Sequence, residues 1–240
     1  MRLTVLFLVL GSFLFLTGCE PTASQYPLIT PEVAIFEPSL VGDWIAESKD
    51  DSRESAVLTF SRRDESNPLS KEYAVKWREG EERQKWVGLL GRVNEQLYLD
   101  LSPEVELNGD GSHILPGVYV EPAFEQKHQV IRISDELLLE IQPGTEEADG
   151  TGTAHPLNIK VSPIHWFFNV RLTEKGLQLG YLDDEDLSKQ IKDKKIQIDH
   201  VLEPEFFLIA KTDRLQRMVI QVGQNPATFT WLEFVKGEAK

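Results

Sequence analysis

The sequence is poor in cysteine and in basic residues, and each shortage excludes one kind of interaction. Its 240 residues include one cysteine, Cys19, so no intramolecular disulfide can form and the fold must depend on a hydrophobic core. Lysine and arginine total 25 against 39 aspartates and glutamates, a net charge of −14. Phosphate backbones repel such a chain, so we expect no nucleic-acid partner.

Motifs of the common enzyme classes are also absent from the sequence. There is no G-x-S-x-G elbow, no glycine-rich loop from strand to helix, and no HExxH or HxH pair. We therefore expect no cofactor and no metal site. His165 with a nearby acid is the one catalytic candidate, because Asn169 and Arg171 should share its strand face. A solvated sheet face is the alternative interpretation. The five histidines are His113, His128, His155, His165 and His200.

A long apolar run occurs only at the N-terminus. Residues 3–16 are almost wholly apolar and follow Arg2. As a helix they would span about 21 Å, which is short of the ~30 Å hydrocarbon core of a bilayer. A positive start, a short apolar stretch and small residues at its end predict a secretory signal peptide over residues 1–18.

The end of this run carries a more specific pattern. Leu16-Thr17-Gly18-Cys19 resembles the lipobox of bacterial lipoproteins. In that family the cysteine receives a diacylglycerol, the leader is cleaved just before it, and the new amino terminus is acylated. The resemblance implies that Cys19 is the lipidation site and that the lipid bilayer is a partner. Each buried CH₂ contributes about 0.8 kcal/mol, so several acyl chains anchor a domain firmly. An ordinary signal peptide with a chance or buried cysteine is the alternative.

The residue after the cysteine bears on location. In Gram-negative lipoproteins an aspartate at that position tends to retain the protein in the inner membrane, and here it is Glu20. The resemblance therefore implies the outer membrane, with the domain facing the periplasm. Cleavage would leave 24 basic and 39 acidic residues, a net charge of −15.

The mature chain divides into a tether and one domain. Residues 19–38 contain four prolines and no clear period, which predicts a lipidated cysteine followed by a Pro-rich tether. The apolar residues Val33, Ile35 and Phe36 allow the end of this tether to dock on the domain. Residues 39–240 are long enough to form one globular domain with a single large core.

Alternating apolar and polar residues predict antiparallel strands across this domain, with polar turns between them. A first strand is expected to begin at Val41, and further strands are expected at 56–60, 73–77, 86–93, 97–101, 130–133, 137–141, 157–161, 164–172, 177–181, 196–201, 206–210 and 229–234. Loops are expected at 103–130 and 142–156. The clearest alternating positions are Ala56, Leu58 and Phe60; Tyr73, Val75 and Trp77; and Leu97, Leu99 and Leu101.

Two short helices are predicted near the C-terminus. The first, at 183–195, has acidic residues in its first turn and lysines in its last, which complements the helix dipole. The second begins at Thr212 as its N-cap and ends at Gly223. The fold class is therefore α+β, mainly β: an antiparallel meander forming a partly barrel-like sheet with two short C-terminal helices.

Gly42-Asp43-Trp44, at the start of the first strand, resembles the G-x-W signature of lipocalins. The resemblance implies an eight-stranded barrel with the tryptophan at its floor, and a small apolar ligand inside. Lipocalins pack this tryptophan against an arginine on or near the last strand, whereas Arg214 and Arg217 lie on a predicted helix. A core tryptophan after a turn glycine is the alternative.

Two further patterns have competing explanations. The five tryptophans could line a pocket for lipid or sugar, but strand alternation assigns four of them to the core. Residues 106–111 match the opening of a calcium loop at Glu106, Asn108, Asp110 and Gly111, but the expected acid at its twelfth position is Gly117. A turn rich in Asx and Gly explains the stretch equally well. The tryptophans are Trp44, Trp77, Trp86, Trp166 and Trp231.

Together these patterns predict a lipid-anchored lipoprotein of the cell envelope whose domain is a non-enzymatic binding or assembly module in the periplasm. The stretches LVGDW, LYLDL, IHWFFNVRL and TDRLQ together resemble uncharacterised bacterial lipoproteins, a resemblance that implies a location and no activity. The expected partner is an envelope protein or a small apolar ligand. A lipocalin-like carrier and an envelope hydrolase are the alternatives.

Overall fold

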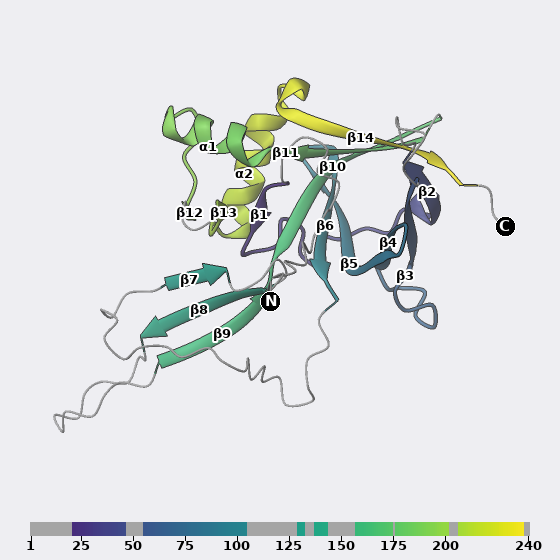
Figure 1. Cartoon of the computed structure of the whole chain (residues 1–240), viewed down its shortest axis with the longest axis horizontal. Coiled ribbons are helices and arrows are strands. Elements are labelled where there is room, and N and C mark those ends of the chain that lie inside the picture. Colours follow the sequence, from purple (N-terminus) through teal and green to yellow (C-terminus); the bar gives the residue numbers. More distant parts are fainter. Residues whose placement is uncertain are drawn as a thin grey trace, which may run out of the picture.

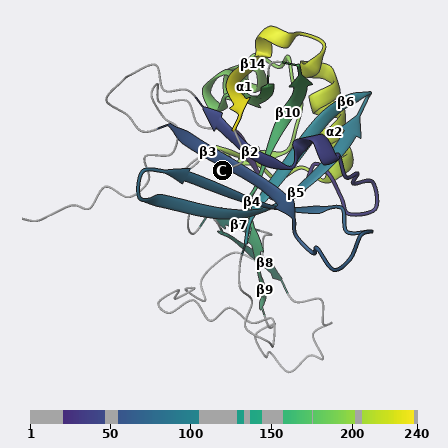
Figure 2. The same cartoon turned by 90° about the vertical axis from the view of Figure 1, so that its right-hand side faces the viewer.

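The fold is a closed antiparallel β-barrel with two helices on its outside (Figures 1 and 2). The computed structural model describes residues 21–46, 55–104, 129–132, 137–143, 157–174, 176–201 and 206–237. Eight strands pair in chain order, and the last pairs with the first. They are β2 (Gly42–Ala46), β3 (Ala56–Arg62), β4 (Glu72–Glu79), β5 (Glu82–Val93), β6 (Gln96–Pro103), β10 (His165–Thr173), β11 (Gly176–Leu182) and β14 (Phe229–Lys236). The predicted fold class, mainly β with a barrel-like sheet and two helices, is confirmed.

Alternation along these strands separates an inner from an outer face, as expected for a pleat with a two-residue period. In β3 and β4 the buried residues alternate with partly or fully exposed ones, and the buried set points into the barrel. The outer face is polar on β3 and β4 but apolar on parts of β5, β6, β10 and β11, where other elements cover it.

Both helices pack on that apolar outer face. They are α1 (Asp184–Lys192) and α2 (Thr212–Gly223), and Figure 1 shows them beside β10 and β11, away from β3 and β4. Asp183 caps α1 by accepting a hydrogen bond from the Asp186 N–H at 3.0 Å. The predicted N-cap of α2 is one residue off: Lys211 occupies it without a side-chain bond, and the Thr212 hydroxyl instead donates to the Pro27 carbonyl at 2.6 Å.

The N-terminal strap, residues 21–37, lies on the barrel and is not an extended tether. Its strand β1 (Ala23–Ser24) pairs antiparallel with the start of β10. The Thr22 N–H donates to the Leu182 carbonyl at 2.9 Å, and Leu28 and Ile29 are fully buried. The tether prediction over 19–38 is therefore wrong for residues 21–38. Its prolines lack N–H donors but do not prevent burial of the apolar residues between them.

Two short strands extend the sheet beyond β1. They are β13 (Phe207–Leu208), parallel to β1, and β12 (His200–Val201), the last strand in this sheet among those described. Longer strands were predicted at 196–201 and 206–210. The segment from Ile196 to Asp199 is extended but unpaired along most of its length, because it lies against α2 instead of a neighbouring strand.

A separate antiparallel sheet is formed by β7 (Gln129–Arg132), β8 (Leu137–Pro143) and β9 (Leu157–Pro163). These three strands match the predicted ones, and β9 continues through Ile164 into β10. Most of the two predicted loops, residues 105–128 and 144–156, lie outside the described residues. Among the described residues, neither helix has the length and apolar character needed to cross a bilayer. Short 3₁₀ helices occur at η1 (Pro38–Leu40) and η2 (Pro226–Thr228).

Candidate functional site

The barrel interior is filled by its own side chains. At mid-barrel the inward face of Gly88 is closely packed: a Cβ there would lie 3.0 Å from Val75 Cγ2, 3.3 Å from Leu101 Cδ2 and 3.4 Å from Leu99 Cδ1. Eight large aromatic residues lie in the same core. They are Trp44, Phe60, Tyr73, Trp77, Trp86, Phe168, Tyr181 and Phe234. Barrels of eight strands are narrow enough for side chains to fill them, and this interior follows that pattern.

Trp44 lies at one end of the barrel in an arrangement that fits the G-x-W resemblance. Gly42 has φ +127°, a backbone conformation that favours glycine, and it brings the chain into β2 directly after η1. The Trp44 indole donates to the Leu40 carbonyl at 2.8 Å. Lys236 of the last strand places its ammonium 5.3 Å from the ring centroid. A lysine thus occupies the place that the resemblance assigns to an arginine.

Tyr73 joins the strap to the same end of the barrel. Its hydroxyl accepts from the Glu37 N–H at 2.7 Å and donates to the Glu37 carbonyl at 3.2 Å. Burial raises the pKa of Tyr73 to about 12. Phe36 stacks on its ring at a centroid distance of 4.9 Å. The phenol is therefore a neutral structural group at physiological pH.

His165, the predicted catalytic candidate, does meet a carboxylate. Its Nδ1 lies 2.8 Å from Asp100 Oδ1, and Asp100 is almost completely buried on the outer face of β6. The other oxygen, Oδ2, accepts from the N–H groups of Leu28 and Ile29 in the strap. Among the described residues, no hydroxyl or thiol is hydrogen-bonded to the His165 ring. The pair binds the strap to the barrel, and its geometry contains no nucleophile.

The other residues predicted to share the face of His165 have structural partners. The Asn169 amide donates to Gln96 Oε1 at 3.0 Å beneath α2. The Arg171 guanidinium lies 3.9 Å from the centroid of the Trp231 ring, which itself covers Gly180 on the outside of the barrel. Core packing, the favoured explanation for the tryptophans, accounts for Trp231 here and for three of the other four inside the barrel.

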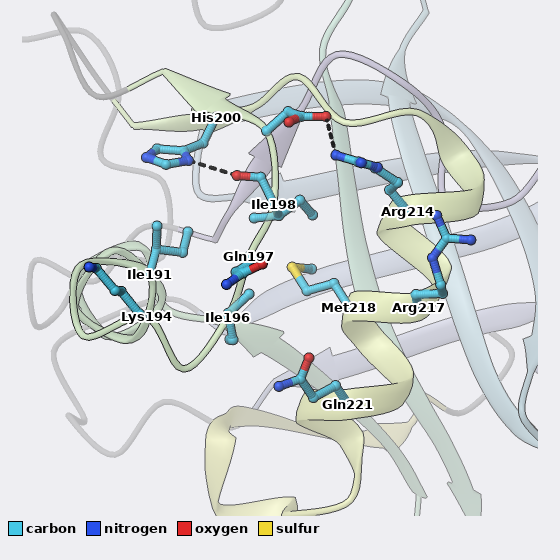
Figure 3. Close-up of a pocket in the computed structure, with 11 residues that line it drawn as sticks. Ile191, Lys194, Ile196, Gln197, Ile198, His200, Arg214, Arg217, Met218 and Gln221 are labelled. Atoms are coloured by element: carbon cyan, nitrogen blue, oxygen red, sulfur yellow. Dashed lines mark hydrogen bonds and ion pairs between the residues drawn. The ribbon is translucent and has the colours of Figure 1, made fainter.

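A groove on the outside of the barrel is a candidate binding site (Figure 3). The α2 groove has a volume of about 630 Å³, within the usual range for ligand sites. Figure 3 shows the extended segment 196–200 between the end of α1 and the exposed side of α2. Its lining consists of Ile191, Lys194, Ile196, Gln197, Ile198, Asp199, His200, Arg214, Arg217, Met218 and Gln221.

Two features of the chain form this groove. On α2 the lining residues Arg214, Arg217, Met218 and Gln221 are spaced by three, four and seven positions, which places them on one helix stripe. The extended segment is held to α2 by Gln221, whose amide donates to the Lys195 carbonyl at 2.9 Å. Ile196, Ile198 and Met218 form the buried apolar floor.

Cationic groups surround that floor, although the protein as a whole is strongly acidic. Arg214 binds Asp199 and Arg217 binds Asp213, each at 2.8 Å. All four side chains are more than half exposed, at 53%, 55%, 67% and 64% in that order. Exposed ion pairs of this kind contribute about 0–1 kcal/mol, so an incoming carboxylate can compete for either guanidinium.

Lys194 adds a third cation at the end of α1. Its φ is +59°, in the left-handed region where glycine or asparagine normally ends a helix. The following N–H, of Lys195, donates back to the Gln190 carbonyl at 2.9 Å, which completes the helix end. No carboxylate of the described residues forms an ion pair with Lys194. A charged side chain thus occupies a position where glycine would be more stable.

The sequence did not identify this groove. The sequence predicts that Arg214 and Arg217 lie on one helix and residues 194–195 at the end of another, without indicating that they share a site. The groove exists because a segment between two helices folds back along the second, which no spacing motif encodes. The signal that could have indicated it was Lys194 itself, a lysine at a helix end where glycine is usual.

Several predicted site residues lie outside the described residues, so their predictions remain open. They are the lipidation site Cys19, the leader 1–18, the calcium-loop stretch 106–111, and His113, His128 and His155. Within the described part of the chain, no three His, Cys, Asp or Glu side chains come together as a group able to hold a metal ion. The four acidic residues at 183–186 form the capped start of α1, as predicted.

Comparison with known proteins gives no family for this chain. No family model, no curated protein and no solved structure matches it.

Proposed function

We propose that this protein is a lipid-anchored lipoprotein of the cell envelope, with a non-enzymatic binding or assembly domain in the periplasm. The lipobox-like residues ending at Cys19 support the anchor. The short distance along the chain between Cys19 and the folded domain is the observation that carries the proposal further. Pro21, two positions after Cys19, forms a bridge with Asp183 at the start of α1, and two residues span at most about 7 Å. An acylated Cys19 would therefore hold the barrel directly at the bilayer, and Glu20 after it supports sorting to the outer membrane.

The binding surface in this proposal is the α2 groove. The interior around Gly88 is packed, whereas the groove is open to solvent and combines an apolar floor with cationic groups. Binding sites usually combine apolar surface with a few placed polar groups, and the groove has both. A domain held at the membrane by one end would present this groove to the proteins around it.

The anchor is tested by Cys19→Ser in the full-length chain, expressed in a Gram-negative host. We expect the wild-type protein in the membrane fraction, with a mature N-terminal peptide that carries the mass of a lipid at Cys19. The variant should keep its leader and lose stable membrane attachment, because the acylated residue is gone. Ser12→Ala, in the leader but outside the lipobox, is the matched control and should behave as wild type. A Cys19→Ser protein that is cleaved and still membrane-bound would refute the proposal.

A carrier of a small apolar ligand is the second candidate, and the Trp44–Lys236 contact at the barrel end favours it. Native mass spectrometry of residues 20–240, which include every described residue, distinguishes the two functions. A retained mass that extracts into organic solvent would support the carrier. A clean apo mass would support a filled barrel and an external binding site.

A further inference from the structure

We propose that the α2 groove binds an extended acidic segment of a partner protein, with apolar residues between its carboxylates. This inference rests on the proposed binding function and names its ligand. The charge of the groove favours an acidic ligand. Lys194, Arg214 and Arg217 line the groove with one acid, Asp199, whereas the mature chain carries a net charge of −15. An acidic ligand is repelled by the chain as a whole, so this cationic patch is where such a ligand gains attraction.

The guanidinium groups are available to a ligand. Arg214 and Arg217 are held only by exposed carboxylates, Asp199 and Asp213. Arginine binds carboxylates in a two-pronged geometry, and exchanging one carboxylate for another leaves no charge buried without a partner. Lys194 gains a counter-ion that the described residues do not provide. A carboxylate-bearing ligand therefore improves the pairing of all three cations.

The shape of the groove indicates an extended chain. The lining residues of α2 from Arg214 to Gln221 cover seven positions, or about 10 Å along the helix axis. That length matches about three residues of an extended strand. Apolar residues of the ligand would lie over Ile196, Ile198 and Met218 while its carboxylates meet the cations at the groove edge. Successive side chains of a strand point in opposite directions. A segment in which acidic and apolar residues alternate can therefore place its carboxylates at the cationic edge and its apolar side chains on the floor.

The backbone of the groove can also pair with such a chain. Gln197 is exposed, and no hydrogen bond to another described residue engages its N–H or its carbonyl. It precedes β12, the last strand in its sheet among those described. Free backbone groups beside a sheet edge accept an added strand in many peptide-binding domains. Peptide recognition by strand addition is thus the binding mode that this geometry supports.

An anionic lipid headgroup shares the chemistry of a carboxylate but fits the geometry less well. Pro21, next to the proposed anchor, forms a bridge with Asp183 at the start of α1. The acids Asp184, Glu185 and Asp186 follow in the first turn of that helix. They lie nearer the anchor than the groove does, so an anionic membrane surface would meet repulsion first.

The test uses the chain from residue 19 with Cys19→Ser, which contains every described residue and needs no detergent. A labelled peptide of alternating glutamate and valine is titrated and followed by fluorescence anisotropy, with a lysine–valine peptide of equal length for comparison. We expect the acidic peptide alone to bind, with affinity that falls as salt rises. Lys194→Gly and Arg217→Gln should each weaken binding on the order of tenfold, and the double variant further. Lys76→Gln, an exposed lysine on β4, is the matched control and should change nothing.

Lys194→Gly is informative because it should fold at least as well as wild type. Lost binding in a protein of unchanged or raised stability cannot come from misfolding. Equal binding of both peptides, or acidic-peptide binding that the groove variants leave unchanged, would overturn the inference. Binding to vesicles of phosphatidylethanolamine and phosphatidylglycerol that the same variants abolish would also overturn it, in favour of a headgroup. Membrane fractionation of Cys19→Ser tests the anchor separately from peptide binding in the α2 groove. Failure of one proposal therefore does not hide failure of the other.

Discussion

Gly88→Ala tests whether the barrel is filled. A hollow interior predicts that the substitution raises the free energy of unfolding, and a filled interior predicts that it lowers it. In the structure the new Cβ would lie 3.0 Å from Val75 Cγ2, well inside the ~3.5–4.0 Å of favourable carbon contacts. Overpacking a core by one methyl group typically costs about 1–3 kcal/mol. Alanine also restricts the unfolded chain, which stabilises the folded state by about 0.4–1 kcal/mol where the residue fits. The expected net effect is a loss of about 1 kcal/mol.

The assay is urea denaturation followed by tryptophan fluorescence, in the chain from residue 19 with Cys19→Ser. Val75→Ala provides the control, because it removes the methyl group that the new Cβ would meet. In that background Gly88→Ala should become neutral or stabilising, and the cycle reports the coupling between the two positions. If Gly88→Ala alone raises the free energy of unfolding, the interior has space at this level and the packing argument fails.

Three further predictions concern the strap and the barrel end. Asp100→Ala should lower the free energy of unfolding by about 3 kcal/mol, because the buried N–H groups of Leu28 and Ile29 lose their acceptor; chemical denaturation measures it. Gly91→Ala should cost about 1–2 kcal/mol, since its Cβ would lie 2.7 Å from the Ile29 side chain; thermal unfolding measures it. Stability should also fall as the pH rises from 10 through 12, by about 2 kcal/mol, because the folded state favours the protonated Tyr73. Tyr73→Phe should reduce this alkaline loss.

Each of these predictions has a result that contradicts it. Asp100→Asn retains one acceptor oxygen and should cost clearly less than Asp100→Ala; equal losses would mean that the carboxylate does not hold the strap. Ile29→Ala should relieve Gly91→Ala, and additive losses from the two changes would place their side chains apart. An alkaline transition identical in Tyr73→Phe and wild type would assign the titration to another group.

Much of the barrel is predictable because its strands have one buried and one solvent-exposed face. Alternation in β3, β4 and β6 and the hairpin of β10 and β11 all follow from period-two patterns that burial then enforces. The G-x-W resemblance led to the correct position for Trp44. Its cationic partner is Lys236 instead of the arginine that the resemblance implies, because a lysine on the last strand can also place a cation near the ring.

The strap and the groove could not be predicted for a common reason. Residues 21–38 have the composition of a linker, and only tertiary pairing with β10 and with Asp100 makes them part of the core. The groove likewise depends on how segment 196–200 lies along α2. Neither arrangement is encoded by local periodicity, since the partners are far apart in the chain.

The strap also imposes an order on folding. Its Thr22 hydroxyl donates to the carbonyl of Leu182, 160 positions later in the chain, and Ser24 pairs with Leu208 in β13. Contacts so distant in sequence form late, because the intervening chain must first be made and brought together. During synthesis from the N-terminus, the strap therefore cannot dock until most of the domain has been made. If Cys19 is acylated as proposed, the enzymes that act on it would meet the strap before it docks on the barrel.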